Sequence, residues 1–198
     1  MTTTRSAADD ARDLPKEPTA PWILTLSVAV ILVWLGVLAW QVAVLPDRVP
    51  THFGAGGEAD GWSTRNGALA FSALLPLVVV LPMPLMSRLV VSAPEFINAP
   101  NKQWWTASGA RLRRFERLLR EDLWLIAALT LALLVAGQVG IVMAARSGTN
   151  QMPAWMLPGA LVVFIVGLGA VLARMFVGGR YAEQPDLQLR DGPARPGL

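Results

Sequence analysis

The chain has 198 residues, of which 54% are hydrophobic and 16% are charged, whereas about 25% of the residues in a typical soluble domain are charged. This composition excludes an ordinary soluble domain, and the absence of cysteine excludes a disulfide framework and a thiolate metal site. The formal net charge of +3 is better explained by orientation in a membrane than by nucleic-acid binding, so we expect no nucleic acid among the partners.

The two ends of the chain differ from the rest in composition. Residues 1–20 are polar, carry charges of both signs and have few large apolar side chains, so we expect a disordered cytoplasmic tail. Residues 178–198 have a similar composition and are expected to form a second disordered cytoplasmic tail. The apolar run after residue 20 exceeds the roughly 7–15 residues of a signal-peptide core, and we expect it to be retained as a transmembrane helix.

Four runs contain no Asp, Glu, Lys, Arg or His, namely residues 21–44, 67–87, 123–145 and 152–173. About 20 apolar residues in a helix cross a hydrocarbon core of about 30 Å, so each run is long enough to cross a membrane. The sequence therefore predicts an all-α integral membrane protein with four transmembrane helices, in a membrane domain that covers residues 21–177.

Basic residues are distributed unevenly around these runs. Fourteen of the 17 lysines and arginines lie before the first run, between the second and third runs, or at and beyond the end of the fourth. Because cytoplasmic loops carry an excess of lysine and arginine, both termini and the middle loop are predicted to be cytoplasmic (N-in/C-in). We expect a multi-pass protein of the cell membrane whose loop 46–66 is extracytoplasmic.

The outer loop contains the only histidine of the chain, His52. The loop has 21 residues, whereas a usual helix–helix connection has about 2–8. Four glycines permit tight turns, and Phe53 and Trp62 are large apolar side chains that a disordered linker would not need. We therefore predict an ordered loop packed on the outer face of the membrane.

The same loop carries four ionisable side chains of interest: Asp47, His52, Glu58 and Asp60. Histidine with carboxylates can coordinate a divalent cation, but one histidine is fewer than a catalytic zinc site usually has. The chain also lacks HExxH, GxSxG and phosphate-loop motifs. We therefore expect no enzyme activity, no catalytic residue, no cofactor and no bound metal, with a metal-assisted enzyme as the weaker alternative. Because histidine titrates near physiological pH, His52 is also a candidate pH-responsive group.

The second and third runs contain residues that are unusual in a transmembrane helix. Pro76, Pro82 and Pro84 each remove a backbone N–H, so we expect a kink or local unwinding near Pro82. The carbonyl groups that these prolines leave without a donor must be satisfied by a neighbouring segment. Gln138 is the strongly polar side chain deep in the third run. We interpret it as an interhelical hydrogen-bonding group, with a substrate contact as the alternative.

The middle loop has two parts. Pro94 and Pro100 disfavour regular helix in residues 92–105. Beyond them, Ser108 is a candidate N-cap for a helix with one apolar face, formed by Leu112, Phe115, Leu118 and Leu119, and five arginines on its other faces. We predict a basic amphipathic cytoplasmic helix that lies on anionic lipid, with binding of a cytoplasmic protein as the alternative.

Two motifs in the chain resemble those of a known family. The stretch LPDRVPTHFGAGGEADGWSTR resembles the signature of a widespread prokaryotic membrane domain of unknown function, number 1648. The matching residues are Leu45, Pro46, Val49, Pro50, His52, Phe53, Gly57, Asp60, Gly61 and Ser63, and Arg65 stands where the family usually has lysine. A second motif of the family has the form N-x-P-N-K-x-x-W, and it is matched here by Asn98, Pro100, Asn101, Lys102 and Trp105. The resemblance covers about residues 20–175.

The resemblance also implies a kind of function. This domain occurs at the N-terminal end of SdpI-like immunity proteins, which protect a cell from a secreted killing peptide and relay its presence to a membrane-sequestered transcriptional repressor. We therefore expect a membrane protein of the immunity or signalling type that senses or sequesters an extracytoplasmic peptide or ligand and has a cytoplasmic protein partner. The alternative is a small transporter or an accessory subunit of a transport complex, and both interpretations allow a homo-oligomer.

Overall fold

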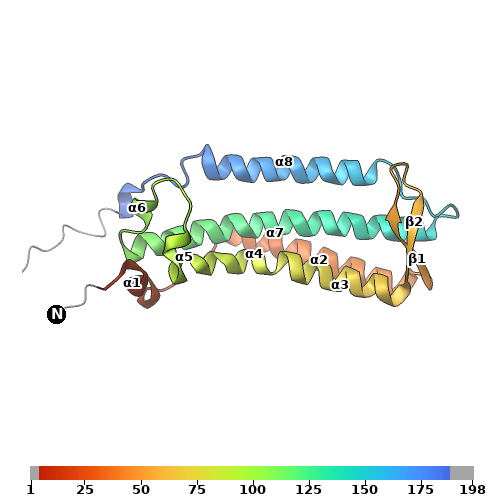
Figure 1. Ribbon diagram of the computed structural model, residues 1–198, viewed down its shortest axis with the longest axis horizontal. Helices are drawn as coiled ribbons and strands as arrows, with labels where there is room; N and C mark the ends of the chain where they lie inside the picture. The colour runs from red at the N-terminus through yellow and green to blue at the C-terminus, as the bar shows by residue number, and fades with distance from the viewer. Residues whose placement is uncertain (1–4, 188–198) are drawn as a thin grey trace, which may run out of the picture.

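The computed structural model describes residues 5–187 of the chain, and residues 1–4 and 188–198 lie outside the described part. Four helices lie roughly along the long axis of an elongated bundle (Figure 1). The candidate membrane spans are Pro21–Val44, Arg65–Ser92, Gly109–Arg146 and Met156–Phe176. Each is long and apolar enough to cross a membrane, which confirms the prediction of four helices of this kind.

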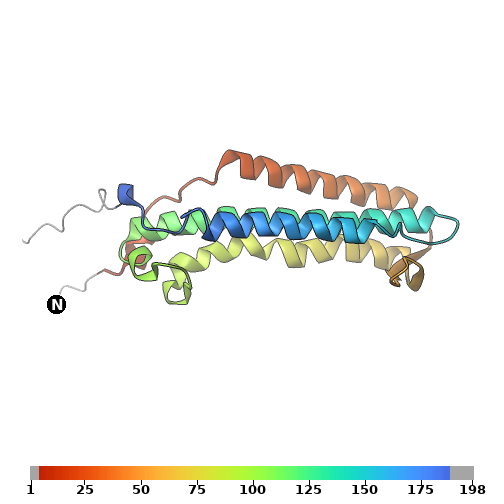
Figure 2. The ribbon, with the colours of Figure 1, turned by 90° about the horizontal axis from the view of Figure 1, so that it is seen from above.

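Helix α7 (Gly109–Arg146) is the central element of the bundle. It packs against α2 (Pro21–Val44), α3 (Arg65–Val80) and α8 (Met156–Phe176), as Figure 2 shows from above. Its 38 residues extend for about 57 Å at 1.5 Å per residue. The predicted amphipathic segment forms the first part of this helix, with Ser108 as its N-cap, and continues into the third apolar run. No glycine or proline between residues 110 and 136 interrupts it.

The expected distortion near Pro82 is confirmed. Helix α3 ends at Val80, and after Leu81 the chain continues as α4 (Pro82–Leu85), η1 (Met86–Arg88) and α5 (Leu89–Ser92). Because a proline ring cannot donate a backbone hydrogen bond, two prolines in four residues remove two bonds from the helical ladder at this point. After Leu81, the second transmembrane segment therefore consists of several short helical pieces.

Pro76, inside α3, leaves the carbonyl of Ser72 without its helical donor. That carbonyl accepts a hydrogen bond from Trp34 Nε1 of α2 at 3.1 Å and another from Gln138 Nε2 of α7 at 3.0 Å. The Ser72 and Gln138 residues are 2% and 6% exposed, so water does not compete for these bonds. This confirms Gln138 as a hydrogen-bonding group between helices, and one carbonyl joins three of them.

Replacing Gln138 by leucine is expected to destabilise the bundle by about 0.6–1.7 kcal/mol, the usual size of an interhelical hydrogen bond in a membrane. The loss should be smaller in a Pro76→Ala background, because an alanine at this position would supply the Ser72 carbonyl with a helical N–H. Denaturant unfolding of the four proteins of this double-mutant cycle in mixed micelles measures the difference. An equal loss in both backgrounds would contradict the proposed role of the proline.

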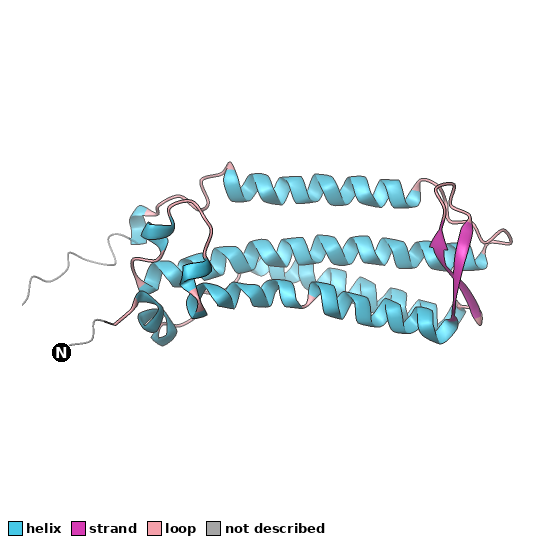
Figure 3. Ribbon diagram, in the orientation of Figure 1, coloured by secondary structure: helices cyan, strands magenta, loops and turns pink. Residues whose placement is uncertain are grey.

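The segment predicted as an ordered outer loop forms a β-hairpin, so the all-α prediction has to be corrected. Strands β1 (Arg48–Phe53) and β2 (Ala59–Thr64) pair antiparallel, with irregular register around His52. Figure 3 shows them at one end of the helices. We call this the hairpin end; it comprises β1, β2 and the connection 147–155. Valine, threonine and aromatic residues on both sides of a glycine-rich turn are typical of such a hairpin.

The opposite end holds short elements that were not expected from the sequence. Residues 5–20, expected to be disordered, include helix α1 (Ala7–Asp13), whose Ser6 and Asp9 form a reciprocal capping box. Residues 178–187, also expected to be disordered, return to this end and bury Tyr181 and Leu187 in the same cluster as the α1 alanines. We call this the arginine end; it comprises residues 5–20, 86–122 and 174–187. The remaining tail residues, 1–4 and 188–198, lie outside the described chain.

Candidate functional site

The base of the hairpin is fixed by its first motif residues and by Arg65. Leu45 is 4% exposed and Val49 is fully buried, in a cluster with Ala68 of α3 and Val142 of α7. The backbone N–H of Arg65 donates to the Asp47 carbonyl at 2.9 Å, and its guanidinium donates to the carbonyl of Val42. Arg65 therefore joins the end of α2 to the start of α3.

The remaining motif residues at the base divide by exposure. Pro50 is buried within β1, where it cannot donate to the sheet, whereas Pro46 is exposed between α2 and the strand. A proline on a strand is tolerated when its position needs no hydrogen bond. Both residues restrict the backbone that leads from α2 into the hairpin.

The tip of the hairpin is attached to the connection between α7 and α8. Gly57 has φ = +87°, and a Cβ at this position would lie 2.5 Å from the Met152 carbonyl oxygen. The Met152 N–H donates to the Gly57 carbonyl at 2.9 Å, and Glu58 forms an isolated β-bridge with Gln151. The motif glycine therefore permits both the turn and the close approach of the two segments.

Gly57→Ala is expected to cost about 1–3 kcal/mol of local stability, because alanine is strained at positive φ and its methyl group would meet the Met152 carbonyl. In this variant the Met152 amide should exchange its hydrogen faster, because the hairpin tip would no longer hold it in a hydrogen bond to Gly57. Gly56→Ala is the matched control, since its added Cβ would meet only the end of the flexible Glu58 side chain. Equal exchange in the two variants would contradict the assignment.

His52 and Asp60 face one another across the two strands. The Nδ1 of His52 is hydrogen-bonded to Oδ1 of Asp60, and the two side chains are 76% and 50% exposed. Gly61 lies opposite His52, where a Cβ would come within 2.7 Å of the histidine Cβ. The motif glycine therefore leaves room for the histidine.

The hairpin surface also carries a cation–π pair, because the Arg48 guanidinium carbon lies 4.7 Å from the centre of the Trp62 ring. The structure does not bring Asp47 and Glu58 to His52 and Asp60 as a metal site. Within residues 5–187, no group of three or more His, Asp or Glu side chains is placed to hold a metal ion. The exposed surface of the hairpin carries polar and aromatic side chains.

A cavity of about 380 Å³ lies beneath the hairpin. Thr51 and Phe53 of β1 line it at the hairpin end, and Phe71 of α3, Gly137 of α7 and Leu161 of α8 line its sides. A second hollow of about 300 Å³ adjoins it, since both are lined by Phe53 and by the start of α8. No sequence pattern indicated these cavities, because their walls come from four separate segments.

The second motif folds the middle loop at the arginine end. Asn101 adopts the left-handed conformation at φ = 56° and precedes the short helix α6 (Lys102–Trp105). Lys102 Nζ donates to the Glu95 carbonyl at 2.6 Å. Asn98 and Pro100 are exposed in the turn before α6.

The last motif residue, Trp105, is fully buried. Its Nε1 donates to the Tyr181 carbonyl at 3.1 Å, and its ring lies 5.3 Å from that of Phe115, which in turn lies 5.2 Å from the Tyr181 ring. The motif therefore positions one tryptophan that holds the segment after α8 against α7. This role could not be read from the sequence, where Trp105 and Tyr181 are far apart.

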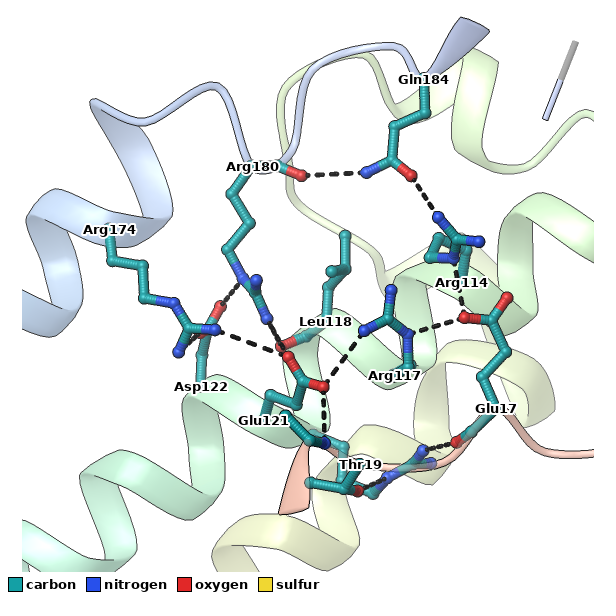
Figure 4. Close-up of polar contacts among 12 residues, drawn as sticks. Glu17, Thr19, Arg114, Arg117, Leu118, Glu121, Asp122, Arg174, Arg180 and Gln184 are labelled. Carbon is teal, nitrogen blue, oxygen red and sulfur yellow. Dashed lines mark hydrogen bonds and ion pairs between the residues drawn. The ribbon is translucent and has the colours of Figure 1, made fainter. Parts of the chain in front are cut away.

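Carboxylates and arginines that are buried or half-buried form a cluster at the arginine end (Figure 4). We call this the ion cluster; its carboxylates are Glu17, Glu116, Glu121 and Asp122, and its arginines are Arg113, Arg114, Arg117, Arg120, Arg174 and Arg180. Most of the arginines expected on anionic lipid are thus paired within the chain. Sequence spacing shows one helix at a time, and the partners Glu17 and Arg180 belong to other segments.

The centre of the ion cluster is the pair Glu121 and Asp122, which are 2% and 0% exposed. Arg180 donates to Glu121 at 2.6 Å and to Asp122 at 3.1 Å, and Arg174 lies 3.3 Å from Asp122. The Ala20 N–H, immediately before α2, donates to Glu121 at 3.0 Å. The cluster therefore joins the start of α2 and the end of α8 to α7.

The hydroxyl of Tyr181 completes this arrangement by donating to Asp122 at 2.8 Å. Burial, and then the negative charge of Asp122, raise the pKa of Tyr181 well above its usual value. The phenol therefore stays protonated and remains a donor to the carboxylate across the physiological pH range.

Comparison with known proteins agrees with the hairpin motif. Residues 28–75 match the family described as "Domain of unknown function (DUF1648)". The predicted resemblance to this family is thereby confirmed for residues 28–75, a shorter stretch than the expected residues 20–175. An uncharacterized protein of Archaeoglobus fulgidus is 37% identical over 90 residues, which cover 43% of this chain and 49% of the relative. The chain thus spans about half the length of that relative, and no solved structure matches it.

The matched DUF1648 residues correspond to particular elements of the fold. They include most of α2, the whole hairpin and the part of α3 that ends just before Pro76. The DUF1648 domain therefore supplies the roof and one side of the cavity, whereas α7 and α8 supply the other sides. The second motif and the ion cluster lie outside the matched residues.

Proposed function

We propose that this chain is a non-enzymatic membrane receptor that senses or sequesters an extracytoplasmic peptide at its hairpin end. The observation that carries the proposal is the cavity of about 380 Å³ beneath the DUF1648 hairpin, with Thr51 and Phe53 in its wall. Binding sites are usually apolar hollows with a few polar groups at hand. Here the two neighbours of His52 in β1 line an apolar hollow, and the pair His52–Asp60 is exposed on the same hairpin.

A peptide fits this arrangement better than a small polar molecule. A two-stranded sheet presents edge strands, and an extended peptide can bind by adding a strand to such an edge. An apolar side chain of the peptide would enter the cavity beside Phe53, while His52, Asp60 and the 38% exposed Trp62 contact its polar parts. Main-chain pairing would give affinity, and the cavity would give specificity.

The distribution of charge supports an extracytoplasmic position for the hairpin. Of the 15 basic residues among residues 5–187, 12 lie at the arginine end, and an excess of lysine and arginine marks the cytoplasmic side. The proposed orientation therefore places the ion cluster on the cytoplasmic side and the cavity in the outer half of a cell membrane.

Helix α7 offers a physical connection between the two ends. Gly137 lies in the cavity wall and Glu121 in the ion cluster, on the same uninterrupted helix, about 24 Å apart at 1.5 Å per residue. Helix α8 is held at its start by contacts near Met152 and beyond its end by Arg180. A shift of these helices on ligand binding would reach the arginine end, where a cytoplasmic protein could bind.

The contacts of His52 support a binding role over catalysis. His52 is hydrogen-bonded to Asp60, and no serine or threonine hydroxyl is bonded to it among the described residues. Nucleophilic catalysis by a histidine–carboxylate pair needs such a nucleophile within hydrogen-bond reach. A pair that is largely exposed on the outside of a hairpin is suited to donate to, or accept from, a bound peptide.

A survival experiment tests the proposal. A host secreting a library of random peptides is grown with and without the chain, and sequencing identifies peptides that kill only without it. Gly137→Leu should abolish this protection, because Gly137 lines the cavity and has open space where the new side chain would grow. Gly169→Leu is the matched control, since Gly169 also has open space but does not line this cavity.

Two results would contradict the proposed function. One is a library in which the chain protects against no peptide. The other is a Gly137→Leu variant that protects as well as the wild type while Gly169→Leu behaves the same.

A further inference from the structure

A second groove lies at the arginine end and is independent of the proposed receptor site. Its first compartment, about 380 Å³, lies between residues 16–19, the pieces α4 and η1, and helix α7. Its second compartment, about 170 Å³, extends along α2 toward Trp34 and Leu131. Leu81, Pro84 and Trp124 line both compartments, so the two adjoin.

The two compartments differ in polarity. Lys16, Arg88 and Arg120 contribute to the lining of the first. The second is lined by apolar residues alone, among them Leu77 and Val80, apart from the indole groups of two tryptophans. The groove therefore has a cationic mouth and an apolar slot, which corresponds to the head and the chain of an amphiphile.

Two of the cations at the mouth are unpaired. Among residues 5–187, no hydrogen bond or ion pair is found for the ammonium of Lys16 or the guanidinium of Arg88, both of which are exposed. The third, Arg120, lies 3.5 Å from Glu116 and also donates to Thr19 Oγ1 at 3.0 Å. Unpaired cations at the boundary of a membrane attract anionic headgroups.

The carboxylates near the mouth are already occupied. Glu17 accepts from Arg114 and Arg117, each at 2.7 Å, as Figure 4 shows. Glu116 accepts from Arg113 at 2.7 Å. Because these carboxylates are neutralised from the α7 side, Lys16 and Arg88 leave the mouth with a net positive charge.

The position of the groove follows from the break in the second transmembrane segment. α3 ends at Val80, and Leu81 and Pro84, which line both compartments, lie at the start of the short pieces that follow. A straight helix would present a continuous ridge of side chains here. The interrupted segment instead leaves a hollow against α7 at the level where the apolar residues give way to charged ones.

We infer that this groove binds one anionic phospholipid, with its phosphate between Lys16 and Arg88 and one acyl chain in the apolar slot. Lys16 and Arg88 hold the lipid, because the chain itself does not neutralise their charges. The arginines at the start of α7, which were expected to lie on lipid, mostly form ion pairs within the ion cluster instead. Bound lipid would fill the space between α2 and the broken segment. The phosphate group could also come from free phosphate, and the experiment separates the two sources.

Native mass spectrometry of the purified full chain tests the inference with mixtures of phosphatidylglycerol and phosphatidylcholine. The wild type should retain one phosphatidylglycerol in preference to phosphatidylcholine. Arg88→Gln should lower that occupancy about fivefold, the effect of one cation near anionic lipid. Lys102→Gln, which removes another exposed cation at the same end, is the charge-matched control and should change it little.

A second pair of variants tests the slot without changing any charge. Leu77→Trp places a larger side chain in the slot and should also displace the lipid. Leu74→Trp changes a 59% exposed residue of the same helix that does not line the slot, and should retain it. Excess inorganic phosphate should not displace the lipid, because it makes no contact with the slot.

The proposed lipid site is refuted by any of three results. Equal retention of the two lipids by the wild type would show that the phosphate charge is not recognised. Equal losses in Arg88→Gln and Lys102→Gln would show general attraction by surface charge. Displacement by inorganic phosphate, with no effect of Leu77→Trp, would show an anion site without a lipid chain. None of these results bears on the hairpin-end cavity, whose test uses Gly137.

Discussion

Asp122→Ala is expected to destabilise the folded protein by about 3–5 kcal/mol, because it removes one side of a buried ion pair and leaves the other charge without a partner. Asp122 is fully buried and lies within 3.1 Å of Arg180 and 3.3 Å of Arg174. It also accepts the hydroxyl of Tyr181 at 2.8 Å. The substitution therefore leaves two guanidinium groups and one phenol with a partner missing.

Denaturant unfolding in mixed micelles, followed by tryptophan fluorescence, measures this loss. Asp186→Ala is the matched control, because Asp186 also pairs with an arginine, at 3.5 Å, but its side chain is 60% exposed. An exposed ion pair contributes about 0–1 kcal/mol. If Asp122→Ala and Asp186→Ala lost equal stability, the buried ion cluster would not hold the arginine end together.

Trp105→Ala is expected to cost about 3–5 kcal/mol, as for other buried aromatic side chains cut to alanine. The loss combines an unfilled cavity in the cluster around Phe115 with a missing donor for the Tyr181 carbonyl. Trp105→Phe keeps an aromatic ring but loses the N–H and part of the buried volume, so its cost should be smaller than that of Trp105→Ala and include about 0.5–1.5 kcal/mol for the hydrogen bond.

The same unfolding measurement, supplemented by limited proteolysis of residues 178–187, reports the effect of Trp105. Trp155→Ala is the control, because Trp155 is 70% exposed. Trp105→Ala should expose the segment after α8 to protease, and the control should not. Full protection of that segment in Trp105→Ala would show that the motif tryptophan does not hold it.

The sequence predicted the membrane helices well because the signal is local. A run of about 20 residues without charge is sufficient to identify a span, and α2 begins and ends at the predicted residues 21 and 44. The sequence also predicted that a neighbouring segment would donate a hydrogen bond near Pro76, since a proline in a helix leaves one carbonyl without its helical donor. That Gln138 and Trp34 supply the donors depends on helix packing.

The arginine end was predicted poorly because its partners come from distant segments. Arg114 and Arg117 were expected to lie on anionic lipid, whereas both donate to Glu17. The segments 5–20 and 178–187 appeared disordered because their own apolar content is low. They are ordered by α7, which buries Ala11 and Leu187 and forms ion pairs with Glu17 and Arg180.

The hairpin end was predicted in part. The motif located the ordered segment, and the structure turns it into two strands held at the base by Leu45 and at the tip by Gly57. The cavity below it was not predictable, because it depends on how α3 and α8 lie on either side of α7. Motif residues thus indicated where a site would be, and packing determined its shape.

The proposed receptor function requires that the hairpin and its cavity face the outside of the cell. Because the chain has no cysteine, single cysteines can be introduced and labelled with a membrane-impermeant maleimide in intact cells. Ala55→Cys at the exposed hairpin tip should be labelled at once, and Gln103→Cys at the arginine end only after permeabilisation. Labelling of Gln103→Cys but not Ala55→Cys in intact cells would contradict the proposed receptor.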